Sequence, residues 1–336
     1  MLAGIAIILF ATACTKKNTD GPVPVAEQIK GDTATVSLYI KKANSFLQTN
    51  YDSLYYYMDR ARAISVALNY AQGVAMARAV ESNYLRRKGD YSGAITLGLQ
   101  VVHMYDSLRM WKELVRLKNV IADIYKEMGG EKGTMEYLEK GIEISKQAQV
   151  VAERERYPFG VIISLNQQAI TLRDMSKESG RNDLMDSAFN LFQRGLQLIN
   201  ETKEGEEELG KFYNNICQVY NEHYKDYPKA LEYVNKAVEF NTKRNNQHSL
   251  TYNYANLSHI YLNMGNTDKA NMYAHMMLAL SRQLASPFRM VNAYNALARI
   301  NKTMGRYDSA LYYKEMNTYL GDSLNNVKRA GLIAES

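Results

Sequence analysis

Cysteine, proline and tryptophan are scarce in this chain. Its 336 residues include 2 Cys, 5 Pro and 1 Trp. Two cysteines cannot build a disulfide-rich scaffold. So few prolines leave few enforced breaks between helices. These shortages exclude a disulfide-stabilised fold and argue against a turn-rich β-sandwich.

Long runs of one charge are also missing. The chain has 41 Lys+Arg against 35 Asp+Glu, for a net charge of +6, and its densest basic cluster is Arg86-Arg87-Lys88. Nucleic-acid-binding proteins concentrate positive charge on one face or stripe. We therefore expect no nucleic-acid partner.

Hydrophobic residues are plentiful, at 46%, and include an unusual wealth of 26 Tyr and 16 Met. This composition is typical of a globular, helical chain. Amphipathic tyrosine rings and flexible thioethers are well suited to fill the joints between helices. The alternative is that some of them line a ligand groove.

The N-terminus carries an apolar stretch of 12 residues, from Leu2 to Ala13. A transmembrane helix needs about 20 residues, so this stretch predicts a signal peptide over residues 1–13. The small residues Ala11-Thr12-Ala13 before Cys14 resemble a bacterial lipoprotein signal, although Ala11 replaces the usual Leu and no basic residue precedes the apolar core. The resemblance implies that Cys14 is lipidated. An ordinary cleaved signal with an incidental cysteine is the alternative.

Residues 14–34 are polar and contain Gly21-Pro22-Val23-Pro24. Such a segment cannot bury enough apolar surface to order itself, and we expect a flexible tether behind the lipid. The predicted location is the cell envelope, with the protein lipid-anchored to a bacterial membrane and facing the periplasm or the cell surface.

A repeat of about 40 residues dominates the rest of the chain. Glycines recur at Gly89, Gly129, Gly265 and Gly305, and the position five residues later continues as a register. The register is formed by Leu54, Ala94, Thr134, Ala188, Ala230, Ala270 and Ala310. Seven units follow, over about residues 35–321.

Each unit is interpreted as a pair of helices. A small residue lies twelve positions before the register in the first helix, at Ser82, Ala122, Ser258 and Ala298, with Cys217 equivalent after a one-residue insertion. Glycine then favours a left-handed helix end. Asp-Ser pairs such as Asp52-Ser53, Asp186-Ser187 and Asp308-Ser309 are predicted to cap the second helix. The longer third interval predicts a first helix from about Pro158 to Gly180, with Ala169 or Ser176 as its small residue.

This pattern resembles the tetratricopeptide repeat family, in the variety with longer helices. The resemblance implies an all-α, right-handed superhelical solenoid of seven helix pairs over residues 35–321. Residues 322–336 are expected to form a C-terminal helix or tail.

Residues for catalysis or metal binding do not cluster in the sequence. The five histidines share no metal-ligand spacing with cysteines or carboxylates, and Cys217 occupies a small-residue position where a buried, inert thiol is expected. We predict no enzymatic activity, no metal and no cofactor.

The feature with binding potential is a series of asparagines three residues before the small residue of the first helices: Asn119, Asn166, Asn214 and Asn295. An amide both donates and accepts hydrogen bonds, so such a ladder can pair with an extended peptide backbone. The family resemblance implies that these helices line a concave groove. The same helices carry basic residues that favour an acidic or C-terminal-carboxylate ligand: Arg86, Arg87, Arg116, Lys126, Lys211, Arg299 and Lys302. The alternative is that each asparagine simply bonds a neighbouring helix.

The function expected from these features is a non-enzymatic lipoprotein scaffold that binds a protein or peptide in its groove and reaches the membrane through its N-terminal lipid. The alternative is the sensory portion of a signalling or transcriptional regulator that lacks its output domain. That alternative rests on the resemblance to exported tetratricopeptide proteins in which the repeats precede a coiled coil, a membrane span and an output domain.

Overall fold

The computed structural model describes residues 31–47, 50–132 and 134–333. The predicted signal peptide, the lipidation site Cys14 and most of the tether lie outside these residues. All regular secondary structure in the described part is helical. None of the helices there is long and apolar enough to cross a membrane.

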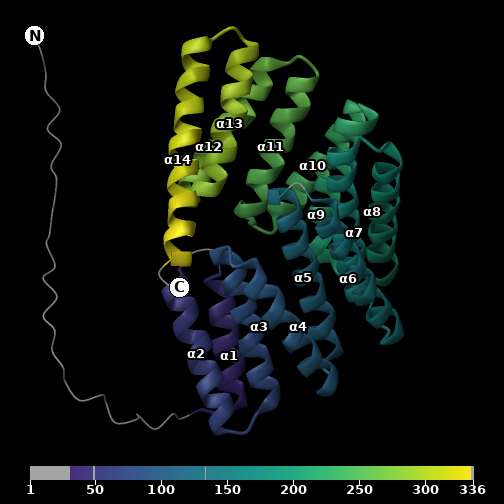
Figure 1. Ribbon diagram of the computed structural model, residues 1–336. Coiled ribbons are helices and arrows are strands. Elements are labelled where there is room, and N and C mark those ends of the chain that lie inside the picture. Colours follow the sequence, from purple (N-terminus) through teal and green to yellow (C-terminus); the bar gives the residue numbers. More distant parts are fainter. Residues whose placement is uncertain (1–30, 48–49, 133, 334–336) are drawn as a thin grey trace, which may run out of the picture.

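Fourteen α-helices follow one another as seven antiparallel pairs (Figure 1). The first helices of the pairs are α1 (Thr33–Ser45), α3 (Ala71–Lys88), α5 (Trp111–Lys132), α7 (Pro158–Ser179), α9 (Leu209–Val219), α11 (Gln247–Asn263) and α13 (Pro287–Thr303). The second helices are α2 (Tyr51–Ala67), α4 (Tyr91–Ser107), α6 (Met135–Arg154), α8 (Asn182–Thr202), α10 (Tyr227–Lys243), α12 (Thr267–Gln283) and α14 (Tyr307–Ile333). A 3-10 turn (Glu206–Glu208) precedes α9, and a π-helical turn (Tyr220–Tyr224) follows it. The predicted all-α solenoid is confirmed.

Glycine ends the first helices at most of the predicted places. Gly89, Gly265 and Gly305 adopt φ of 89°, 78° and 72°, and Gly180 ends α7 with φ 70°. The prediction is wrong for Gly129, because α5 continues past it to Lys132. A Cβ at Gly129 would lie 2.7 Å from a Leu138 methyl carbon, so this glycine allows α6 to approach closely.

The predicted Asp-Ser caps are wrong. α2 is capped by Asn50, whose side chain accepts a hydrogen bond of 2.9 Å from the Ser53 amide. The helices begin one to four residues before each Asp-Ser pair, which therefore lies inside the first turns. The side chains that do cap helices, apart from Asn50, are Asp32, Asp90, Asp226, Asn246 and Asn266.

The small residues of the register lie where two helices of a pair meet. Ser82 and Ser258 are buried and donate hydrogen bonds of 2.7 and 2.9 Å to the carbonyls of Ala94 and Ala270, twelve residues later. Cys217 is fully buried, and burial raises the pKa of its thiol. In α7, both candidate small residues, Ala169 and Ser176, are buried.

Tyrosine rings stack across the joint between the two helices of a pair. The centroids of Tyr261 and Tyr273 are 5.6 Å apart with nearly parallel rings. Other pairs at this joint are Tyr125–Tyr137, Tyr220–Tyr233 and Tyr294–Tyr313. The interpretation of tyrosine as joint filler is confirmed for these residues.

The solenoid curves until its two ends meet. The C-terminal end of α14 returns beside the first pairs, where α14 contacts α3 (Figure 1). α14 runs without interruption through Gly321, so residues 322–333 continue the last repeat helix. Its exposed Lys314 and Thr318 occupy the positions of the buried Ala274 and Leu278 in α12.

Candidate functional site: the inner face of the solenoid

The first helices of the pairs form the inner layer. α5 contacts α7, α9 contacts α11 and α11 contacts α13, whereas no two second helices pack comparably closely within the described residues. A stack bends toward the layer whose members approach most closely, so side chains between the first helices line the concave side. Asn119, Asn166, Asn214 and Asn295 all lie on these helices.

Asn119 is buried and its amide is used within the protein. It donates to the Val115 carbonyl at 3.0 Å and to Ser164 Oγ at 2.8 Å, and it accepts from Ser145 Oγ at 3.0 Å. These bonds join α5, α6 and α7 at one point. Asn119 thus fills the alternative role of bonding neighbouring helices.

Asn166 and Asn214 belong to a network of amides that runs across α7, α9 and α11. Asn215 Nδ2 donates to Asn166 Oδ1 at 3.0 Å. Asn214 Oδ1 accepts from Asn253 Nδ2 at 2.7 Å and Asn256 Nδ2 at 3.1 Å. Both predicted asparagines are half-buried, and each therefore has bonds to other helices and a surface toward the groove.

Asn295 is exposed on α13, together with Arg299 and Lys302. Among the described residues, neither of these two cations has an ion-pair partner within 4.0 Å. The C-terminal end of the inner face therefore carries available positive charge.

A cluster of paired charges lies in the N-terminal half of the inner face. Arg86, with its side chain 9% exposed, reaches from α3 to Asp123 and Glu127 on α5, with Nη2 2.6 Å from Glu127 Oε1. Burial opposes the charged form, but these carboxylates outweigh it and raise the pKa of Arg86. Lys126 pairs with Asp123 at 2.7 Å. These two predicted ligand-binding cations thus already have carboxylate partners.

The other predicted cations are the half-buried Arg87 and the exposed Arg116 and Lys211, which lie on three different helices. The Arg116 guanidinium lies 5.4 Å from the centre of the Phe159 ring, and Lys211 Nζ lies 2.7 Å from Glu208. The structure therefore does not gather all the predicted basic residues into one site.

A cavity of ≈ 380 Å³ opens on the same layer where α9 ends in its π-helical turn. It is lined by Asn221, Glu222, Lys225, Tyr227, His259 and Asn263. Asn263 Nδ2 donates to Asn221 Oδ1 at 3.1 Å, which directs Asn221 Nδ2 toward His259 Nδ1, 3.3 Å away. Glu222 also forms an ion pair with Lys177 of α7, with 2.7 Å between Oε2 and Nζ.

The pKa of His259 lies below its usual value. Burial lowers its pKa, and the positive charges of Arg299 and Lys177 lower it further, while Glu222 acts in the opposite direction. A neutral ring can accept the hydrogen bond from Asn221 at Nδ1 and donate at Nε2. The cavity therefore offers polar groups in a positive environment.

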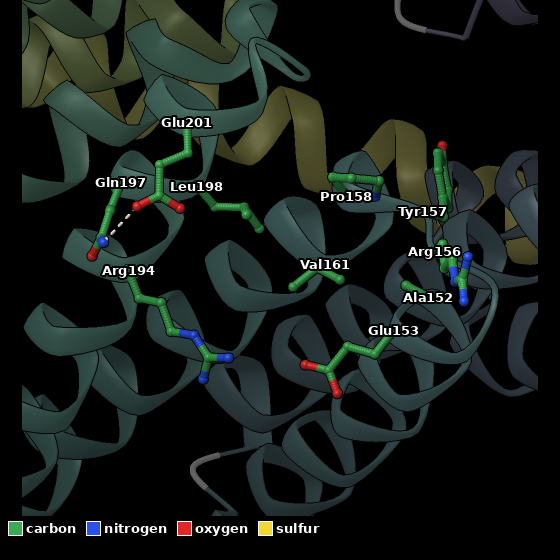
Figure 2. A pocket seen from close by; sticks show the side chains of 10 residues that line it. All are labelled: Ala152, Glu153, Arg156, Tyr157, Pro158, Val161, Arg194, Gln197, Leu198 and Glu201. Carbon is green, nitrogen blue, oxygen red and sulfur yellow. Dashed lines mark hydrogen bonds between the residues drawn. The ribbon is translucent and has the colours of Figure 1, made fainter.

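A second cavity, of ≈ 420 Å³, lies away from the inner layer, between the end of α6, the start of α7 and α8 (Figure 2). Ala152, Pro158, Val161 and Leu198 provide apolar surface, and Figure 2 shows Glu153 and Arg194 on opposite sides of the opening. The charged groups alternate in sign around the rim and do not converge on one point.

Comparisons with known proteins agree with this architecture. A profile of the tetratricopeptide repeat matches residues 252–274, from α11 into α12. The apo form of RapI aligns at 13% identity with a TM-score of 0.61, covering 87% of this chain and 99% of RapI. A Rap protein complexed with competence and sporulation factor aligns at 12% identity with a TM-score of 0.62, covering 90% of this chain and 79% of that chain. BtubC from P. vanneervenii aligns at 18% identity with a TM-score of 0.52, covering 71% and 91%.

The chain folds as a tetratricopeptide-like solenoid, and one of its units matches the repeat profile. Comparison with curated protein sequences gives no match. At identities this low, similarity to solved structures shows the fold alone. The function of this repeat protein must therefore be inferred from its own inner face.

Within the described residues, no three His, Cys, Asp or Glu side chains are arranged to hold a metal ion. The buried Cys217 thiol, with its raised pKa, is a poor nucleophile. The chemistry that the inner face supports is hydrogen bonding and charge attraction.

Sequence reasoning missed several inner-face residues, notably Arg173, Asn215, Gln218, Asn256 and His259. A signal for some of them was present, because the position directly after the small residue of each first helix is repeatedly polar. That position is occupied by Asp123, Gln218, His259 and Arg299. Side chains there project between neighbouring first helices.

Proposed function

We propose that this protein is a non-enzymatic scaffold that binds a peptide or protein segment along its inner face. The observation that carries the proposal is the amide network across α7, α9 and α11, which leaves polar side chains half-exposed on the concave side. Groups of this kind bind an extended backbone without requiring a particular side-chain sequence. The fold shared with a Rap protein complexed with competence and sporulation factor is compatible with such a use.

An acidic ligand, or one presenting a C-terminal carboxylate, suits this face best. Arg299 and Lys302 on α13 and Lys225 beside the inner cavity are exposed, and within the described residues they have no carboxylate within ion-pair distance. Cations that lack internal partners attract anions from solution, with a strength that depends on salt concentration.

The proposal includes the location. A short apolar stretch that ends before Cys14 supports export and lipid attachment. The scaffold would then stand on the outer side of a bacterial cytoplasmic membrane or at the cell surface, held by its lipid.

A capture experiment with paired variants tests the binding face. The wild-type chain, the inner variant Arg299→Ser/Lys302→Ser and the outer control Arg194→Ser/Lys203→Ser are each incubated with detergent-solubilised membranes, and bound proteins are identified by mass spectrometry. Both double variants remove two exposed cations, so they have the same change in net charge.

We expect wild type and the outer control to capture the same partner and the inner variant to lose it, with unchanged thermal midpoints. Equal capture by all three chains would contradict a role for the cationic end of the inner face. Recovery of a DNA-binding or kinase protein would favour the sensory alternative.

A further inference from the structure

The inner layer has one wide joint, between α7 and α9. α5 packs against α7, and α9 against α11, but α7 and α9 make no comparably close approach in the described residues. Polar side chains span the distance instead. Lys177 reaches Glu222 at one end of the joint, and Arg173 occupies its middle.

Arg173 makes the central contacts. Its side chain is 12% exposed. Its Nη1 donates to Gln218 Oε1 at 2.8 Å and to Asn215 Oδ1 at 3.2 Å, while Asp174 lies 3.3 Å from its Nη2. One guanidinium of α7 therefore holds two amides of α9.

This contact fixes the direction of the hydrogen bonds that lead from Asn215 and Gln218. A guanidinium donates but never accepts, so the oxygens of Asn215 and Gln218 must face Arg173 and their NH₂ groups must point away. Asn215 accordingly donates to Asn166 Oδ1 at 3.0 Å, and Gln218 Nε2 donates to Asn256 Oδ1 at 3.3 Å.

The same order of donor and acceptor continues in the hydrogen bonds between α9 and α11. Because Asn256 Oδ1 faces Gln218, the Nδ2 atom of Asn256 faces Asn214 and donates to Asn214 Oδ1 at 3.1 Å. Asn253 adds a second bond to that oxygen at 2.7 Å and in turn accepts from Asn241 at 2.9 Å.

Two asparagines lie at the ends of these series of hydrogen bonds. Their oxygen atoms accept bonds from the network, and their NH₂ groups donate none within it. These asparagines are Asn166 and Asn214, whose Nδ2 atoms donate no hydrogen bond to any described residue. Both side chains are half-exposed on the inner face.

We propose that Arg173 is a positioning residue that polarises the amide network, so that Asn166 and Asn214 present N–H donors and the groove selects the carbonyl or carboxylate oxygens of its ligand. This inference rests on the proposed function for its ligand. The orientation of the amides is a property of the free protein and can be measured without any ligand.

Two substitutions of Arg173 distinguish its effect on the orientation of the amides from its effect on packing. Arg173→Lys keeps a donor-only group, whereas Arg173→Gln supplies an amide that can either donate or accept. Both shorten the side chain and lose the guanidinium fork. Arg194→Gln, an exposed arginine on α8, is the control for loss of charge in the same helix pair.

Hydrogen exchange of the side-chain amides measures the orientation in the full chain labelled with ¹⁵N at Asn and Gln. In wild type we expect the NH₂ groups of Asn215 and Gln218 to exchange more slowly than those of Asn166 and Asn214. Arg173→Gln should accelerate exchange at Asn215 and Gln218 by about tenfold, the effect of one lost hydrogen bond. Arg173→Lys should largely preserve the slow exchange.

The buried Asn119 reports on folding in the same spectra, because its amide bonds Val115, Ser145 and Ser164 and has no contact with the network around Arg173. A variant in which Asn119 also exchanges fast has lost its local structure, and the ratio of exchange rates within wild type then decides the orientation. Two results would contradict the proposed orientation of the amides. One is equal exchange rates for Asn166, Asn214, Asn215 and Gln218 in wild type. The other is equal exchange rates in the folded Arg173→Lys and Arg173→Gln variants.

Selection of oxygen ligands is tested with two small probes. Acetate only accepts hydrogen bonds and methylammonium only donates them. In wild type we expect a saturable shift of the Asn166 and Asn214 NH₂ signals with acetate and none with methylammonium, and an apparent acetate affinity about tenfold weaker in Arg173→Gln.

The two proposals can fail separately. If the amides are polarised and respond to acetate but no partner is captured from membranes, the proposed function fails and the polarity stands. If a partner is captured but acetate leaves both NH₂ signals unmoved, the scaffold stands and oxygen selection through Asn166 and Asn214 is rejected.

Discussion

Asn214 and Asn295 occupy equivalent positions in the sequence but differ in their surroundings. Asn214 accepts hydrogen bonds from Asn253, which is fully buried, and from Asn256. Asn295 is exposed and has no hydrogen-bond partner in the described part of the chain. The same residue type therefore bonds neighbouring helices at one position and is exposed to solvent at the other.

This difference predicts unequal stability effects. Asn214→Ala leaves a buried donor of Asn253 without its partner, which should lower the free energy of unfolding by about 1–3 kcal/mol. Asn295→Ala should change it by less than about 0.5 kcal/mol. Thermal or urea unfolding of both variants checks the prediction, and a more stable Asn214→Ala variant would contradict the network.

His259 predicts a dependence of stability on pH. Its pKa is below the ordinary value of 6.5, because of burial and of the charges on Arg299 and Lys177. The unfolded chain therefore takes up the proton at higher pH than the folded one, so stability is present above about pH 6.5 and is lost as the pH falls through the folded pKa. Protonation of Nδ1 also removes the acceptor for Asn221.

The measurement compares thermal midpoints at about pH 7.5 and about pH 5.5 for wild type and His259→Gln. Other groups titrate in both chains, so only the difference reports on His259. We expect the midpoint of wild type to fall further on acidification. An equal fall in the two chains would show that His259 is not destabilised by its charge.

At the scale of elements, glycine serves two different packing requirements. Gly195 on α8 faces the Phe212 ring of α9, which occupies the space that a Cβ would need. Gly321 on α14 has nothing within 4 Å of such a Cβ. Both are helical, so alanine would otherwise improve helix stability at either position.

We therefore predict opposite effects of the same substitution. Gly195→Ala should destabilise the protein by about 1–3 kcal/mol through overpacking against Phe212. Gly321→Ala should stabilise it by about 0.5–1 kcal/mol. Urea unfolding separates the two, and stabilisation by both substitutions would mean that α8 and α9 are less closely packed than described.

At the scale of the whole molecule, the seven helix pairs follow a strongly curved path. Each helix pair packs mainly on its neighbours, so stability approximates a sum of interfaces. The slight inward bend at each joint accumulates until α14 contacts α3 (Figure 1). Along the inner face, Arg86 and Lys126 have carboxylate partners, whereas Arg299 and Lys302 near the C-terminal end have none in the described residues.

The proposed lipid anchor also concerns the whole molecule. Cys14 is the residue on which the lipid would be attached, and the described helices include none that could cross a membrane. Replacing Cys14 with Ser should move the protein to the soluble fraction and abolish labelling by radioactive palmitate. Membrane retention of the Ser variant would reject lipid attachment at this residue.

The sequence alone predicted the architecture because the determinants of a helix pair are local. A small residue, a glycine that can adopt positive φ and a register residue fall within a single unit of about 40 residues, and α7 accordingly begins at Pro158 and ends before Gly180. The cap of α2 was misplaced because Asn50, rather than Asp52, is the residue that precedes the helix and accepts from the Ser53 amide. The α5 end was misplaced because close packing with Leu138, rather than a turn, requires Gly129.

The tertiary structure alone decided what the asparagines do. Asn119 meets Ser164, 45 residues away, and Asn214 meets Asn253, 39 residues away. Such partners come from other helices, and their approach depends on the crossing of each pair over the next. The periodicity placed these amides on the first helices, but only the packing of α7, α9 and α11 determined which of their atoms are occupied and which remain free to bind.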